Sequence, residues 1–136
     1  MSDKLLVKEN PRIVVIQKLY SQHLNEDSEL YFPKHRYKKF IKDVVIGTIE
    51  RKELIQSLID KELENNINKQ KTDLMVKIMI MAAIYEFMFM HKTPIKVIIT
   101  EYLKVSDSFI KPSQKNFLNA ILDKASKISR DLHVTN

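Results

Sequence analysis

The chain contains a single glycine, Gly47, among its 136 residues. Folds made of strands depend on glycine at hairpin turns and bulges, so this feature argues strongly against an all-β protein. It also excludes glycine-rich phosphate loops, because neither a dinucleotide-binding fingerprint nor a Walker loop can be written with one glycine. We therefore predict an all-α fold, in which Gly47 is either a close packing point or a helix C-terminal cap.

Apolar residues recur with helical spacing along almost the whole chain. Helix starts are indicated at Asn10-Pro11, Thr93-Pro94 and Pro112, where a capping side chain or a proline suits the first turn. Loops are indicated at residues 25–28 and at Pro33. The sequence thus predicts six helices, at about residues 11–25, 34–48, 50–66, 74–90, 94–108 and 112–131.

The same spacing predicts which side chains face the core. The buried face of the second helix begins with Tyr37, and that of the third includes Leu54. Both faces continue with aliphatic residues at three- and four-residue steps. The buried face of the first helix consists of Ile13, Ile16, Leu19, Tyr20, His23 and Leu24.

The segment from residue 74 to residue 90 differs from the others in being apolar on every side. Only Lys77 and Glu86 interrupt its LMVKIMIMAAIYEFMFM sequence. Seventeen residues is marginal for a membrane span, and a charge near the centre of a bilayer costs about 2–3 kcal/mol. We expect a central core helix, with its methionines as flexible core filler and no association with a membrane.

The charge balance favours a polyanionic partner. The chain carries 23 basic and 17 acidic residues, for a net charge of +6. Such an excess suits nucleic acid, although a basic domain with no such partner has the same composition. Residues 34–39 place four cations around Tyr37, which suits phosphates and a stacked base. The alternative is a basic helix start whose tyrosine is core.

The inventory of reactive groups does not suggest an enzyme. Cysteine is absent, which excludes disulfides, thiol catalysis and thiolate metal sites. The four histidines, His23, His35, His91 and His133, show no metal-binding spacing. We expect no catalysis, no metal and no cofactor. Residues 1–7 lack the apolar stretch of an export signal, so we expect a cytoplasmic protein.

Three ordered segments of the C-terminal half carry a family resemblance. They read MIMAAIYEF from residue 79, TPIKVIITE from residue 93 and FLNAILDK from residue 117. In the N-terminal half, IQKLYS from residue 16 and the spacing of Asp43 to Gly47 fit the same pattern. Together they resemble the NusB transcription antitermination factors over about residues 10–130.

The resemblance implies a fold and a function. It implies one NusB-like helical domain over residues 1–136, made of an N-terminal bundle at about 10–66 and a C-terminal bundle at about 70–131. It also implies binding to the boxA element of ribosomal RNA leaders, together with the ribosomal protein NusE, in an RNA polymerase antitermination complex. Two alternatives remain: an RNA-targeting module like those of ribosomal RNA cytosine methyltransferases, for which we expect no catalytic domain here, and a protein-interaction or homodimer module. Val14 and Val15, off the predicted apolar face, suit a homodimer contact.

The expected RNA-binding residues combine the resemblance with local chemistry. Lys8 and Arg12 suit phosphates or else form a solvated first turn, and Tyr20 and Phe117 suit bases or else pack in the core. The N-terminal cations of the family are depleted here, so we expect weak binding alone and help from the partner protein. The candidate RNA-binding residues are Lys8, Arg12, Tyr20, Lys38, Lys39, Lys96, Lys115, Phe117 and Asn119.

Overall fold

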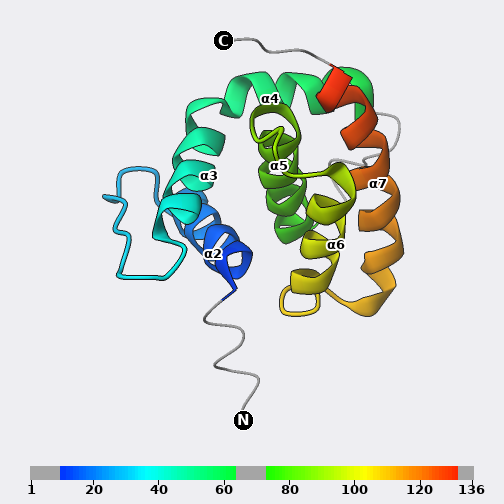
Figure 1. Cartoon of the computed structure of the whole chain (residues 1–136). Coiled ribbons are helices and arrows are strands. Elements are labelled where there is room, and N and C mark those ends of the chain that lie inside the picture. Colours follow the sequence, from blue (N-terminus) through cyan, green and yellow to red (C-terminus); the bar gives the residue numbers. More distant parts are fainter. Residues whose placement is uncertain (1–9, 64–72, 132–136) are drawn as a thin grey trace.

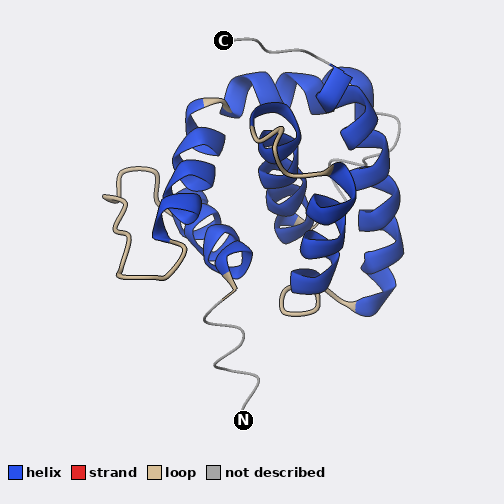
Figure 2. Cartoon of the chain, viewed as in Figure 1, coloured by secondary structure: helices blue, strands red, loops and turns tan. Residues whose placement is uncertain are grey.

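The computed structural model describes residues 10–63 and 73–131, and all regular structure within them is helical (Figures 1 and 2). The prediction of an all-α fold is confirmed. A π-helical turn, η1, continues directly from α4. The elements are α2 (Pro11–Leu24), α3 (Lys38–Glu50), α4 (Lys52–Leu58), η1 (Ile59–Leu63), α5 (Leu74–Phe89), α6 (Ile95–Ser106) and α7 (Pro112–Asp131).

Two helix starts follow from local capping chemistry. The Asn10 side chain accepts a hydrogen bond of 3.0 Å from the Arg12 amide, and Pro11 occupies the first helical turn of α2. Asp73 caps α5 in the same way, accepting a bond of 2.7 Å from the Met75 amide. These side chains satisfy amides that have no partner inside the helix, which fixes where each helix begins.

Helix α5 is the centre of the molecule. Helices α2 and α3 lie on one side of it and α6 and α7 on the other, while α4 and η1 cross its end to reach α7 (Figure 1). Helix α2 also contacts α6 directly. The predicted boundary between two bundles, at residues 66–70, lies outside the described residues, so the division into bundles stays a prediction.

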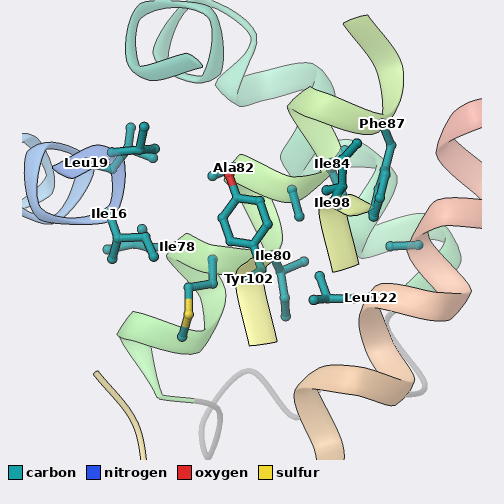
Figure 3. Packing of buried hydrophobic residues seen from close by; sticks show 14 of the residues in the cluster. Ile16, Leu19, Ile78, Ile80, Ala82, Ile84, Phe87, Ile98, Tyr102 and Leu122 are labelled. Atoms are coloured by element: carbon teal, nitrogen blue, oxygen red, sulfur yellow. The ribbon is translucent and has the colours of Figure 1, made fainter. Parts of the chain in front are cut away.

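The sides of α5 are covered almost all round. Ten of its sixteen residues are buried, which confirms the predicted central helix. Figure 3 shows the side chains of α5 between those of α2 on one side and those of α6 and α7 on the other. None of the described helices is long and apolar enough to cross a membrane.

Gly47 is a close packing point. It lies inside α3, which continues to Glu50, so it does not cap the helix. A β-carbon at this position would collide with the ring of Tyr85 from α5. The first of the two predicted roles is therefore the one observed, and it brings α3 and α5 together more closely than a side chain would permit.

The second and third helices depart from prediction. Helix α3 begins at Lys38 rather than residue 34, because residues 35–38 form a turn in which the Tyr37 amide donates to His35 Nδ1 at 2.9 Å. Tyr37 therefore precedes the helix and is 44% exposed, not part of the core. Helix α4 gives way to the π-helical turn after Leu58, and Leu54 on its outer face is 46% exposed.

Helix α2 is covered on more sides than its apolar spacing predicts. It contacts α3, α5 and α6, so Val15 is fully buried and Val14 is partly buried. These residues were predicted to lie off the buried face and to suit a homodimer contact, which is wrong for Val15. Conversely His23 and Leu24, predicted to face the core, are exposed because they lie at the last turn of the helix.

Candidate nucleic-acid interface

The first turns of α2, α3 and α7 lie at one end of the molecule, at the bottom of Figure 1. Arg12, at the start of α2, lies 4.8 Å from the ring centre of Phe40 in the first turns of α3. Helix α7 follows α6 after a short connection, so its start lies where α6 finishes. We call this region the basic end, because it carries the exposed lysines Lys38, Lys39 and Lys42 together with Lys115.

Arg12 is buried at the basic end rather than offered to a ligand. Its Nη2 and Nε donate to the two carboxylate oxygens of Glu86 at 2.6 and 3.0 Å, and Tyr102 donates to the same carboxylate at 2.5 Å. Burial alone would lower the pKa of Arg12, but the hydrogen bonds and charge of Glu86 raise it. The geometry fits neither the predicted phosphate contact nor a solvated first turn, because Arg12 is 8% exposed and its guanidinium is already paired.

Exposed cations gather at the start of α3. Lys38 and Lys42 lie one turn apart and have no ion-pair partner among the described residues. Lys39 forms an ion pair of 2.8 Å with Asp43, whose hydrogen bond and charge raise the pKa of Lys39. Arg36 lies over the exposed ring of Tyr37 at 5.5 Å. These exposed cations can neutralise several phosphates without breaking a buried ion pair.

The α7 residues divide between the surface and the core. Asn119 is exposed and lies one turn from Lys115, which pairs with Asp107 at 3.0 Å. Phe117 is half-buried and packs against the hydrophobic core. Residues two positions apart on a helix do not face each other, so the structure does not place Phe117 and Asn119 around one site.

The other predicted residues do not join this surface. Tyr20 is half-buried against the core, as its helical phase suggested. Lys96 is exposed at the start of α6, so the length of that helix, about 18 Å, separates it from the basic end. Lys8 lies outside the described residues. Lys38 and Asn119 share the basic end, but α2 and α6 lie between their helices.

One further group of cationic and aromatic side chains is visible only in the folded chain. The Lys18 ammonium on α2 lies 5.7 Å from the ring centre of Tyr31 and 6.0 Å from that of Phe32. Tyr31 is 71% exposed. The two adjacent aromatic residues before Pro33 are the signal in the sequence, but only the fold brings Lys18 beside them.

Within residues 10–63 and 73–131 there is no group of three or more histidine, aspartate or glutamate side chains that could hold a metal ion. The described surface instead offers ammonium groups, amides and aromatic rings. These are the groups that bind phosphates and unpaired bases.

The arrangement defines a class: small all-helical proteins built around one buried apolar helix, with cations gathered at one end. A sequence model of the NusB family matches residues 7–127, so the chain belongs to the NusB family.

The relatives support this assignment. The transcription antitermination protein NusB of Rhodopseudomonas palustris is 26% identical over 105 residues, which cover 77% of this chain and 59% of that protein. The protein of the same name from Caulobacter vibrioides is 24% identical, over 88% of this chain and 92% of its own length. The match thus spans less than two thirds of the first of these relatives. A solved structure of T. maritima NusB has the same fold, with a TM-score of 0.75 at 21% identity over 93% of this chain and 92% of that one.

Proposed function

We propose that the protein is a transcription antitermination factor that binds single-stranded boxA-type RNA together with the ribosomal protein NusE. The observation that carries this proposal is the match of the NusB family to residues 7–127, with relatives named as transcription antitermination proteins. The proposed role is one of binding, within an RNA polymerase complex, and not of catalysis.

The basic end is the proposed RNA surface. Lys38 has no ion-pair partner among the described residues, so it meets a phosphate without breaking an existing contact. Lys39 and Lys115 must each exchange a carboxylate for a phosphate. Asn119 supplies the exposed amide that hydrogen-bonds to base edges, while Phe117 packs against the core and positions the first turns of α7. Arg12 acts instead by holding α2 against α5.

The partner protein supplies what this surface lacks. The cations of α3 and the amide of α7 are separated by α2 and α6. The axes of packed helices lie about 8–10 Å apart, and the separation between the two groups spans at least two such distances. An RNA bound at both places therefore crosses a stretch of surface between α3 and α7 where the described residues offer it few contacts. We propose that NusE covers this gap and raises the affinity for the RNA.

A titration of fluorescently labelled RNA tests the proposal. The full chain is mixed with a boxA-like RNA or its scrambled version, with and without NusE, and binding is followed by anisotropy at several salt concentrations. We expect weak, salt-dependent binding of both RNAs alone and tighter binding of the boxA-like RNA when NusE is present. Equal affinity for the two RNAs in the presence of NusE, or no binding at all, would overturn the proposal.

A further inference from the structure

A pocket opens between the first halves of α2 and α3 and the loop that precedes α3. Its volume is about 280 Å³. Ile41 is buried at its floor, and Gln17 and Lys38 are exposed at its rim. It is therefore a recess that opens to the surface, on the side of α2 that carries Lys18.

The lining combines apolar walls with groups that recognise a polar, anionic ligand. Val14 and Phe32 are half-buried and give flat apolar contact, while Gln17 offers an amide with no hydrogen-bond partner among the described residues. An amide can donate and accept at once, as the edge of a nucleobase requires. Lys18 and Lys38 stand beside it, and no carboxylate lines the pocket.

The charge around the pocket specifies the sign of the occupant. Besides Lys18 and Lys38, the exposed cations Lys34, Arg36 and Lys42 lie on the neighbouring loop and on α3. Such a concentration of positive charge attracts a polyanion and disfavours a cationic or purely apolar ligand. A free inorganic anion is not the best-fitting occupant, because it makes no favourable contact with the apolar walls.

The size of the pocket suits a nucleobase. A closed cavity of about 150 Å³ accepts benzene, so a recess of about 280 Å³ has room for the ring system of one base. Unpaired bases are recognised by contact with apolar or aromatic side chains and by hydrogen bonds at their edges. Tyr31, which is 71% exposed beside Lys18, extends the surface for a neighbouring base.

We propose that this pocket binds one unpaired base of a single-stranded RNA, with Gln17 at the base edge and Lys18 and Lys38 on the flanking phosphates. The inference rests on the proposed RNA-binding function and adds to it a specific subsite, on α2 and the loop before α3 rather than on α7.

Filling the pocket tests the inference directly. Gln17→Phe places a ring at the rim from an exposed position, and a matched control, Gln56→Phe, makes the same change at an exposed glutamine of α4. We expect Gln17→Phe to weaken binding of a ten-nucleotide single-stranded RNA by about five-fold or more, the range for loss of one stacked base. Gln56→Phe should leave the affinity unchanged. Normal RNA affinity in the folded Gln17→Phe variant overturns the subsite while leaving the proposed function intact.

A second measurement separates failure of the subsite from failure of the function. Nucleoside monophosphates, inorganic phosphate and a polyglutamate peptide are titrated into the ¹⁵N-labelled chain. We expect the nucleotides alone to shift the amide signals of Gln17, Lys18 and Ile41. Equal shifts with phosphate would reduce the site to an anion site, and shifts with the peptide alone would assign it to an acidic protein; either result overturns the base pocket. Nucleotide shifts without binding of longer RNA would support the pocket and contradict the proposed function.

Discussion

The ring of Tyr85 on α5 occupies the space that a β-carbon of Gly47 on α3 would need. This pair sets the distance between the central helix and α3 at their crossing. The ring also lies 5.1 Å from that of Phe89, one turn further along α5, and burial raises the pKa of Tyr85. The only glycine of the chain is therefore required for packing rather than for a turn.

Gly47→Ala should destabilise the protein although alanine is the better helix former. The substitution gains about 1 kcal/mol in helix propensity but forces the Tyr85 ring to move, and overpacking costs about 1–3 kcal/mol. We expect a lower free energy of unfolding in urea. In a Tyr85→Ala background the clash is absent, so the same substitution should become stabilising. Stabilisation in both backgrounds would contradict the packing role.

Arg12→Ala should cost much more than the loss of a surface ion pair. The change leaves the carboxylate of Glu86, which is fully buried, without its charged partner. Breaking such a pair costs about 3–5 kcal/mol. Urea unfolding of Arg12→Met, of Glu86→Gln and of the variant that combines them measures the coupling. We expect the double variant to be less destabilised than the sum of the two single changes, and additive losses would rule out the coupling.

Tyr102 should make the protein sensitive to alkaline pH. Its burial, followed by the charge of Glu86, raises the pKa of the hydroxyl well above its usual range. The unfolded chain loses this proton near pH 10, whereas the folded chain retains it. The contribution of Tyr102 to the free energy of unfolding is therefore fully present below pH 10 and falls above it. The free energy of unfolding of the wild type minus that of Tyr102→Phe should be constant from about pH 6 to 9.

Above pH 10 that difference should shrink by up to about 1.4 kcal/mol per pH unit, the value for one proton. The comparison with Tyr102→Phe cancels the contributions of the other tyrosines and of the lysines. Chemical denaturation at a series of pH values gives both free energies. A difference that stays constant through pH 11 would show that the hydroxyl ionises equally in both states.

Lys38 and Asn119 should affect RNA binding in different ways. Lys38→Gln combined with Lys39→Gln should weaken all single-stranded RNAs alike and make the log–log salt dependence shallower by about 0.7 per lost phosphate contact. Asn119→Ala should cost about 1–3 kcal/mol on the cognate RNA and little on a scrambled one. Lys127→Gln, whose lysine pairs with Asp123 further along α7, is the control for the loss of a single surface charge.

Anisotropy titrations at four salt concentrations distinguish these effects. Identical responses of cognate and scrambled RNA to both substitutions would contradict the division between phosphate and base contacts. If neither substitution changes the affinity for either RNA in the presence of NusE, the result would favour the hypothesis that this protein is an interaction module without an RNA role.

The helix boundaries could be predicted where a capping residue or proline marks them. Asn10-Pro11 and Pro112 place the starts of α2 and α7 correctly, because the chemistry that starts a helix is local. Tyr37 and Leu54 were misplaced because apolar spacing does not reveal where a helix begins or how many neighbours cover it.

The site was harder to predict because its contacts are not local. Arg12 in a first turn has the sequence environment of a phosphate ligand, and its partner Glu86 lies 74 residues away. The Lys18 group likewise depends on a loop that folds back over α2. Charge and family resemblance indicate an RNA-binding surface, but only the fold shows which cations are already paired.

The position of α5 has a consequence for how the molecule comes apart. The helices on both sides pack against α5, so displacement of α5 exposes the apolar side chains of both halves. Partly unfolded forms with one half intact are therefore penalised, and the chain should melt in a single cooperative transition. Fluorophores placed on α2 and on α7 should report the same midpoint in urea, as should the far-ultraviolet circular dichroism. An event that loosens α5 at one side is then transmitted to the other by the shared helix.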